Sequence, residues 1–448
     1  MAGPGVPSCP LVLGVDGGGT GTTCHAHILD PNGGGRTLAT GVGEGGSANA
    51  NSVGFDVAVR AVTTAALAAL RHLGFDDDAS RSLLESGVAP LPSSSAFDFP
   101  REDASAIPPP TDGGSTAPIG EVRLRAACAC LAGCDAPEDR LRWRDALRIV
   151  IPGLRADLDP SLLVVDNDAV AALASGSHRP NLPDHHLDDD DAGDPVGVVL
   201  VAGTGTVAFA VRADPDRTRA RTAGWGPAFD DVGSGHWIGS RALAAVARAV
   251  DGRGQKTTLA RRVARAATAN DDVDANELVR WAYEDGPAPA WDKVASLAPV
   301  VFDACEEGDE VARRIVDEAR EGLFRSIEAL VTPDDGDDTG DSGGINTGDT
   351  GNTGDIGAPG DANPRGSIPR VVLCGGLLAE TPLGASLAAR LRERARELWN
   401  GDEYDDDEKE TSRIRIPRRK PAWGAAMIAR RAWTKSREGM RATREGGP

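Results

Sequence analysis

The chain has 448 residues, enough for two or three domains with a large buried core. Its formal net charge of -20 at pH 7 disfavours nucleic acid and anionic membranes as partners, because both repel an acidic surface. No apolar stretch approaches the roughly 18 residues that span a bilayer, and the first residues lack the basic region of a signal peptide. Seven cysteines without a small disulfide scaffold favour a cytoplasmic protein in a reducing compartment.

The basic residues are mostly arginine, and lysine is rare. An acidic, lysine-poor composition is typical of a halophilic protein, because hydrated carboxylates keep a protein soluble at high salt. The alternative is a GC-rich genome that favours Arg, Ala, Gly and Asp codons. Codon usage alone does not explain the negative charge balance, so the composition favours the halophilic interpretation.

The first elements are predicted to form an antiparallel meander with a phosphate-binding turn. Residues 11–15 are an apolar run typical of a strand, and residues 16–20 follow as Asp-Gly-Gly-Gly-Thr. Residues 24–29 alternate like a second strand, residues 30–35 reverse the chain, and residues 36–41 can form a third strand. A strand that ends in exposed N–H groups and hydroxyls suits phosphate oxygens.

The rest of the first half alternates helices and strands around one insertion. Residues 89–120 are rich in Pro, Ser, Asp and Gly and are expected to be a mostly disordered insertion. The other elements expected here are a glycine loop at 41–54, a helix at 55–73, an ordered run at 121–130, a turn at 132–135, a helix at 137–151, a buried strand at 162–165, a helix at 169–175 and an acidic surface turn at 180–195.

The second half repeats the plan of the first. Residues 198–201 are apolar, Gly203, Thr204 and Gly205 form a second glycine-threonine turn, and residues 207–211 resume the apolar alternation. Two such turns in one chain favour two half-sites that close on one polyphosphate. The later elements expected are a loop at 224–235, a helix at 236–250, helical segments to about 330, a low-complexity loop at 332–367, a strand at 371–374, a helix from near 381 and helical structure after 423.

Asp16 is a candidate ligand for the Mg²⁺ of a nucleotide, with the following glycines and Thr20 lining the phosphates. The alternative is an aspartate that satisfies only its own turn. The second copy of the turn favours the nucleotide site. Neither turn is a Walker P-loop, because no Gly-Lys-Ser/Thr follows, and neither is a dinucleotide fingerprint, because each leads into a strand and not a helix.

Asp168 stands where a strand gives way to a helix, so its carboxylate can face a cleft and accept a proton from a hydroxyl substrate. Asp166 shares the carboxyl end of that strand. The alternative is a helix N-cap at Asp166 or Asp168, because aspartate is a preferred capping residue. The spacing leaves both interpretations open.

The Gly-Trp-Gly segment at 224–226 and Asp231 combine close backbone approach, an aromatic face and a carboxylate, which suits a polar ring such as a sugar. The alternative is a core tryptophan flanked by turns. Asn49 and Asn51, in the glycine loop, can bond sugar hydroxyls or can simply form turns.

Three cysteines, Cys128, Cys130 and Cys134, raise the question of a metal or iron–sulfur site. Their spacing matches no common pattern of paired Cys-x-x-Cys ligands, so we expect buried structural thiols. His185 and His186 lie among aspartates and are expected at the surface.

Taken together, these motifs resemble the BadF/BadG/BcrA/BcrD-type ATPase family and, within it, the N-acetylglucosamine kinase-like branch. The wider superfamily holds actin, sugar kinases and heat-shock chaperone ATPases. The motifs that carry the resemblance are Val15 to Thr20, Leu131 to Gly133, Asp166 to Ala169, Ala202 to Gly205, Gly224 to Gly226, Asp231 to Ser234 and Leu373 to Gly376.

The resemblance implies an α/β fold of two ribonuclease-H-like (actin-like ATPase) domains with a nucleotide cleft between them, which binds ATP and Mg²⁺. The domain limits that follow are 8–178 for the N-terminal domain, 196–423 for the C-terminal domain and 424–448 for a helix that packs back on the N-terminal domain. The insertions at 89–120 and 332–367 interrupt the two domains.

The resemblance also implies roles for single residues. The aspartate that matches Asp168 acts as the base toward the sugar hydroxyl. The residues that match nucleotide positions are Asp16, which also holds Mg²⁺, and Gly17, Gly18, Gly19, Thr20, Gly203, Thr204, Gly205, Gly375 and Gly376. The residues that match sugar positions are Asn49, Asp168, Gly224, Trp225, Gly226 and Asp231. The family usually has glycine before the aspartate of an Asp-Glu-Gly-Ser segment, whereas here Asp230 precedes Asp231, and this difference bears on which sugar is bound.

We therefore expect an ATP-dependent kinase for an amino sugar, N-acetylglucosamine or glucosamine, whose partner is a small-molecule sugar. One alternative is an ATPase that activates a dehydratase and bridges a cluster across a dimer through cysteines near the nucleotide. Residues 231–235 contain no cysteine, which argues against it. The other alternative is a non-catalytic sugar-binding regulator. A homodimer is compatible with the sequence, which leaves the oligomeric state open.

Overall fold

The computed structural model describes residues 8–31, 36–92, 120–155, 158–176, 195–211, 219–269, 274–284, 286, 289–331, 370–399, 414–417 and 419–445. The chain divides into two compact units. Unit 1 comprises Met1–Pro195, Asn352–Gly354 and Arg419–Pro448, and unit 2 comprises Val196–Gly351 and Asp355–Arg418. Each unit contains both helices and strands, so the α/β class expected from the sequence is confirmed.

The sheet of unit 1 begins with an antiparallel meander and continues with parallel strands. Its strands are β1 (Ser8–Gly17), β2 (Thr22–Leu29), β3 (Thr37–Gly45), β4 (Val88–Pro90), β5 (Glu121–Leu131) and β6 (Leu163–Asn167). The order is β3-β2-β1-β5-β4, and β6 also pairs with β5. Strands β1, β5 and β6 are parallel, so their carboxyl ends lie at the same edge of the sheet.

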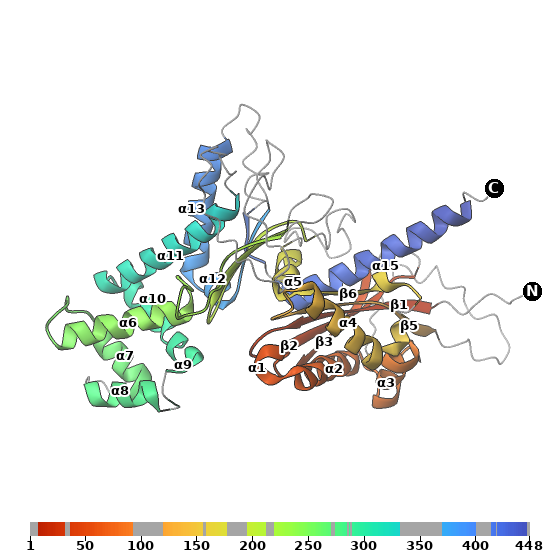
Figure 1. Ribbon diagram of the computed structural model, residues 1–448, viewed down its shortest axis with the longest axis horizontal. Helices are drawn as coiled ribbons and strands as arrows, with labels where there is room; N and C mark the ends of the chain where they lie inside the picture. Colours follow the sequence, from red (N-terminus) through yellow and green to blue (C-terminus); the bar gives the residue numbers. More distant parts are fainter. Residues whose placement is uncertain are drawn as a thin grey trace, which may run out of the picture. The chain divides into compact units, whose positions relative to one another are not determined.

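Helices cover both faces of this sheet. They are α1 (Ala50–Val53), α2 (Phe55–His72), α3 (Asp77–Ser86), α4 (Pro137–Val150), α5 (Asp168–Ser175) and α15 (Pro421–Glu445), with short 3-10 turns at Pro152–Leu154 and Pro160–Leu162. Helix α2 packs on β2 and β3, and α15 packs on β1, β5 and α5 from the opposite face (Figure 1). Both contacts need glycine in the strand, because a Cβ on Gly41 would lie 2.1 Å from Ala69 O and one on Gly14 would lie 2.0 Å from Ala426 N.

Unit 2 repeats this strand order. Its strands are β7 (Gly197–Ala202), β8 (Thr206–Val211), β9 (Arg219–Ala223), β10 (Val371–Cys374) and β11 (Ile414–Arg415), in the order β11-β10-β7-β8-β9. Strands β7, β8 and β9 form an antiparallel meander, and β10 and β11 run parallel to β7. The repeat predicted from the two glycine-threonine turns therefore extends to the whole sheet.

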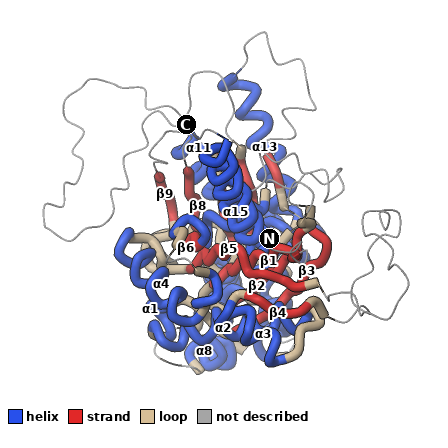
Figure 2. Tube along the Cα trace, turned by 90° about the vertical axis from the view of Figure 1, so that its right-hand side faces the viewer, coloured by secondary structure: helices blue, strands red, loops and turns tan. Residues whose placement is uncertain are grey.

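The helices of unit 2 form a layer that is rich in buried alanine, valine and leucine. They are α6 (Gly235–Val250), α7 (Leu259–Thr268), α8 (Ala275–Tyr283), α9 (Trp291–Ala295), α10 (Ala298–Glu306), α11 (Glu310–Val331), α12 (Gly376–Ala379) and α13 (Pro382–Trp399). Helix α11 packs against β8 and β9 (Figure 2), and its Leu323 and Ile327 are buried in the core of the unit.

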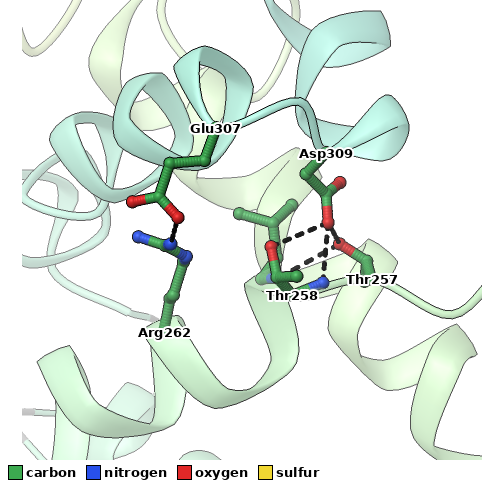
Figure 3. A network of polar contacts seen from close by, with 6 residues as sticks. Thr257, Thr258, Arg262, Glu307 and Asp309 are labelled. Atoms are coloured by element: carbon green, nitrogen blue, oxygen red, sulfur yellow. Dashed lines mark hydrogen bonds and ion pairs between the residues drawn. The ribbon is translucent and has the colours of Figure 1, made fainter.

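A polar network fixes the start of α11 to the start of α7 (Figure 3). Asp309 caps α11, because its Oδ1 accepts hydrogen bonds from the backbone of Val311 and Ala312 at 2.9 and 3.0 Å. Its Oδ2 accepts from both Thr257 and Thr258, and Arg262 pairs with Glu307 alongside. All of these side chains are satisfied by one another, so we interpret the network as structural.

Some predicted boundaries are wrong. The third strand does not end at residue 41 but continues to Gly45, because β2 supplies backbone partners as far as the pair Thr22 and Gly45. The insertion expected from residue 89 begins later, since Ala89 and Pro90 belong to β4. The predictions for 93–119, for 332–367 and for most of the acidic turn at 180–195 fall outside the described residues, and His185 and His186 fall there too. Within the described chain, no helix has the length and apolar character needed to cross a bilayer.

Candidate functional site

Asp16 lies at the carboxyl end of β1, in one row with Cys130 of β5 and Asp166 of β6. Side chains in one row of a sheet point to the same face. Burial, as the larger cause, and the charge of Asp168 together raise the pKa of Asp16 to about 7. Among the described residues no hydrogen bond contributes to the pKa of the Asp16 carboxylate, which argues against an aspartate that satisfies only its own turn.

The turn after β1 is held by backbone hydrogen bonds and leaves its tip open. Gly18 N donates to Gly21 O at 2.9 Å, Ala132 N donates to Gly17 O at 2.7 Å, and Ala48 N donates to Gly18 O at 3.2 Å. Gly19 and Thr20 are exposed. Two loops from elsewhere in unit 1 therefore brace the turn, while Thr20 stays exposed.

The turn after β7 in unit 2 follows the same plan. Gly203 N donates to Gly205 O at 2.9 Å, while Gly235 N donates to Gly203 O at 2.7 Å and His236 N donates to Thr204 O at 3.2 Å. Thr204 and Gly205 are exposed. Each unit thus ends its first strand in a braced turn with an exposed threonine.

Asp168 is the first residue of α5, and its neighbour Asn167 is the N-cap. Asn167 Oδ1 accepts from Ala169 N at 2.8 Å, so Asn167 is the cap and the alternative of a cap at Asp166 or Asp168 is not what the structure has. The pKa of Asp168 is raised to about 6, mainly by burial; the Ala169 N–H opposes the rise and the charge of Asp135 contributes to it. A carboxylate with this pKa is ionised at neutral pH and is basic enough to take a proton.

The turn after β5 lies against Asn49 and Asn51. Gly133 has φ +75°, and a Cβ there would lie 2.6 Å from Asn51 Nδ2 and 3.2 Å from Asn49 Oδ1. Asn49 also caps α1, since its side chain accepts from Asn51 N at 3.1 Å. Asn49 therefore does form a local turn, and this turn places its side chain beside the turn that follows β5.

Asp135 is a member of this group that the sequence did not single out. Its Oδ1 accepts from Asn167 Nδ2 at 2.6 Å, across 32 positions of sequence. The available signal was an aspartate two residues after the glycine of the turn at 132–135, which follows a buried strand. That signal does not reveal the partner, because only the pairing of β5 with β6 brings the two segments together.

In unit 2, Asp231 lies beside the second glycine-threonine turn. A Cβ on Gly205 would lie 2.9 Å from Asp231 Oδ2. Asp231 is buried, its φ is +60°, and its Oδ1 has no hydrogen-bond partner among the described residues. Burial raises the pKa of Asp231, whereas hydrogen bonds from the backbone of Gly226 and Thr206 lower it. A non-glycine residue in this backbone region is strained, and such strain clusters at functional sites.

Trp225 is 68% exposed, with the Arg221 guanidinium 5.7 Å from its ring centre. The alternative of a core tryptophan is therefore wrong. Gly224 and Gly226 on either side have φ +74° and +84°, so the segment turns sharply and presents the indole ring outward.

Gly375 joins β10 to α12 at the same sheet edge as the turn after β7. Its φ is +96°, and a Cβ there would lie 2.2 Å from Ala202 O. At Gly376 a Cβ would meet nothing within 4 Å, so this position is open. The structure thus brings Gly203 to Gly205, Asp231 and the Gly375 turn together within unit 2.

The predicted residues fall into two groups. Unit 1 carries Asp16 to Thr20, Asn49 and Asp168, and unit 2 carries the segments 203–205, 224–226 and 375–376 with Asp231. Each group is described within its own unit, so the cleft predicted between the domains stays a prediction.

The three central cysteines are buried, as predicted. The Sγ atoms of Cys128 and Cys130 lie 3.6 Å apart, and the contact with Cys128, together with burial, raises the pKa of Cys130 well above its usual range. Thiols in this state are protonated and do not favour metal binding. Within the described residues no cluster of three or more His, Cys, Asp or Glu side chains could hold a metal ion by itself.

Comparison with known proteins agrees with these motifs. Residues 185–346 match the model of the BadF/BadG/BcrA/BcrD ATPase family. The resemblance predicted from the sequence is confirmed. The chain is also similar to two curated proteins. One is an N-acetyl-D-glucosamine kinase of Dictyostelium discoideum, 29% identical over 211 residues. The other is an N-acetylmuramic acid/N-acetylglucosamine kinase of Clostridium acetobutylicum, 31% identical over 206 residues.

These alignments cover 47% and 46% of this chain and 58% of each relative, so the chain spans little more than half the length of the curated relatives it matches. A solved structure from Chromobacterium violaceum, named as a candidate N-acetylglucosamine kinase, aligns with 94% of this chain and 98% of its own. Its TM-score is 0.52 at 22% identity, which shows a shared fold.

Proposed function

We propose that the protein is an ATP-dependent kinase that phosphorylates an amino sugar, N-acetylglucosamine or glucosamine. The observation that carries the proposal is the Asp168 carboxylate at the first turn of α5, with its pKa raised to about 6 and Asp16 close enough to feel its charge. Similarity to two kinases of N-acetylated amino sugars supports the choice of substrate class.

Asp168 acts as the general base in this proposal. It takes the proton of the sugar hydroxyl, whose oxygen then forms a bond to the γ-phosphorus of ATP while the bond from that phosphorus to the β,γ-bridging oxygen breaks. ADP leaves, and the proton remains on Asp168 until solvent removes it. A pKa near 6 suits this role at neutral pH, because the group is ionised and still a useful base.

The nucleotide would be held by backbone and hydroxyl groups of both braced turns. We assign the phosphates to the turns at 17–20 and 203–205, and the adenosine to Gly375 and Gly376. The carboxylate of Asp16 would fit a Mg²⁺ ion that takes its remaining ligands from phosphate oxygens and water. Bound there, Mg²⁺ would offset the charge of the transferring phosphoryl group.

The sugar would be held by residues that keep unused polar groups. Asp231 offers a buried carboxylate oxygen without a partner among the described residues, and Trp225 offers an exposed aromatic face. Asn49 and the backbone of Gly224 and Gly226 complete the proposed set. Both units have an antiparallel meander of three strands followed by parallel strands, which supports a pair of ribonuclease-H-like domains as the frame.

The test is ADP release with Mg²⁺ and ATP over a panel of hexoses and amino sugars, with mass spectrometry of the product. We expect release that depends on an amino sugar, together with a product heavier by one phosphoryl group. Asp168→Asn should abolish phosphorylation while ATP still binds, and Asp145→Asn, on the exposed face of α4, should behave like the wild type.

Three outcomes would contradict the proposal. Sugar binding without ADP release would indicate a regulator, and ADP release without sugar, in a coloured iron-containing protein, would indicate a dehydratase activator. Full sugar-dependent turnover by Asp168→Asn would remove the role given to Asp168.

A further inference from the structure

The side-chain amide of Asn167 is held in one orientation by two hydrogen bonds. Its Oδ1 accepts from Ala169 N at 2.8 Å, and its Nδ2 donates to Asp135 Oδ1 at 2.6 Å. The reverse orientation would point the NH₂ group at an N–H donor and the carbonyl oxygen at a carboxylate, so both contacts would be repulsive. The Asp135 contact is also charge-assisted, which makes it the stronger of the two.

The same Ala169 N–H reaches the proposed base. It donates to Asp168 Oδ1 at 3.0 Å as well as to Asn167 Oδ1 at 2.8 Å. One donor is thus shared between the capping amide and the Asp168 carboxylate. Any rotation of the Asn167 amide changes how that donor is shared, and with it the position of the Asp168 oxygen.

Asp135 is itself held firmly enough to act as an anchor. Its backbone carbonyl accepts from Arg140 Nη1 at 2.8 Å, and the turn before it is closed by a bond from Cys134 N to Leu131 O at 3.1 Å. Leu131 is the register partner of Asn167 in the parallel pair β5 and β6. Asn167 therefore ends β6, and Asp135 lies in the turn that follows the adjacent strand β5.

We propose that Asp135 is a positioning residue of the acceptor site, which holds the Asp168 carboxylate in place through the side-chain amide of Asn167. The inference rests on the kinase function proposed above and adds a residue to its machinery. Asp135 acts on the geometry of the base and does not itself touch the reacting atoms.

The variants that test this are Asp135→Ala, which removes the contact, and Asp135→Asn, whose amide oxygen can still accept from Asn167. With N-acetylglucosamine as acceptor we expect Asp135→Ala to lower kcat by about 10- to 100-fold, because a small displacement of a catalytic group has an effect of this size. KM for ATP and the Tm should change little, and Asp135→Asn should recover most of kcat. Asp145→Ala, also an aspartate of this region, is the matched control.

A double-variant cycle separates positioning from direct action. If Asp135 acts through Asn167, the double variant Asp135→Ala with Asn167→Ala has the same kcat as Asn167→Ala alone. Independent, multiplying losses would overturn the proposal, as would an Asp135→Asn variant as impaired as Asp135→Ala, or an unchanged kcat in Asp135→Ala. If Asp135→Ala does not fold, Asp135→Ser takes its place, since its shorter side chain cannot span to Asn167.

Hydrogen exchange tests the same link without turnover. We expect the amides at the start of α5 to exchange at least about tenfold faster in Asp135→Ala than in the wild type, while α2 is unaffected. Unchanged protection at α5 would overturn the inference whatever the activity. A wild type that phosphorylates no sugar, combined with faster exchange in the variant, would instead reject the proposed function and leave the Asp135 link standing.

Discussion

The carboxylates of Asp16 and Asp168 share one edge of the unit 1 sheet, and each is partly withdrawn from water. Burial is the main cause of both raised pKa values, and the charge of Asp168 also acts on Asp16. An ionised, buried carboxylate without a cation costs folding free energy. This cost is the expected signature of a site arranged for a charged ligand and not for stability.

The residue-scale prediction concerns Asp16→Asn without Mg²⁺ or nucleotide. The pKa of Asp16 is about 7 in the folded chain and 3.8 in the unfolded chain. Between these two pH values the folded chain holds a proton on Asp16 that the unfolded chain has lost, so the folded state loses stability as the pH rises from about 4 to 7. At pH 8 the variant should therefore be more stable than the wild type by about 1–2 kcal/mol, although the proposed kinase activity should be lost. Thermal unfolding measures this, with Asp145→Asn as control, and a variant with an equal or lower Tm would contradict it.

At the scale of elements, α15 packs on a face of the unit 1 sheet where β2 carries two buried histidines. His25 and His27 of β2 are buried with their rings 5.8 Å apart, and neither nitrogen of His27 has a hydrogen-bond partner among the described residues. Burial lowers the pKa of His25 to about 4 and that of His27 to about 3. The charges of Arg419, Lys420 and Arg430 act in the same direction, so both histidines fold as neutral groups.

This predicts a loss of stability in acid. In the unfolded chain both histidines take up a proton near pH 6.5, whereas in the folded chain they stay neutral to about pH 4 or below. Their contribution to the free energy of unfolding is therefore fully present above pH 6.5 and is lost as the pH falls from 6.5 to about 4. His27→Leu should lose less Tm between pH 7 and pH 4.5 than the wild type. The comparison isolates His27 because the carboxylates titrate in both proteins, and parallel curves for the two proteins would contradict the prediction.

At the scale of the whole molecule, the two units share one strand order, and the chain passes from unit 1 to unit 2 after Pro195 and returns at Arg419. The return places α15 on the sheet of unit 1. The net charge of -20 belongs to the chain as a whole and acts against its compact state through self-repulsion.

The whole-molecule prediction concerns salt. Screening of like charges should make the protein more stable and more active in molar KCl than in dilute buffer, with a rise in Tm that levels off once the charges are screened. Activity and thermal unfolding over a KCl series measure this, with NaCl as a check on ion identity. Greatest activity at the lowest salt would contradict the halophilic interpretation.

The sequence by itself determined the features that depend on short stretches of chain. The apolar run before Asp16, the run before Gly203, and the strand that leads into Asp168 were readable, because a strand and the turn after it are encoded by adjacent residues. Weak segments were missed: β4, β9, β11, α3 and α12 are short or polar, and they form because neighbouring elements supply their partners.

Only the tertiary structure decided which polar groups meet and how they titrate. Asp135 reaches Asn167 because β5 and β6 are adjacent, and Asn167, not an aspartate, caps α5. The pKa of Asp16 is raised mainly by burial, and the strand that carries it pairs with β5 and packs against α15, both far along the chain. Spacing in a sequence cannot show either effect, because contact between distant segments and exclusion of water arise only when the sheet and its helices are assembled.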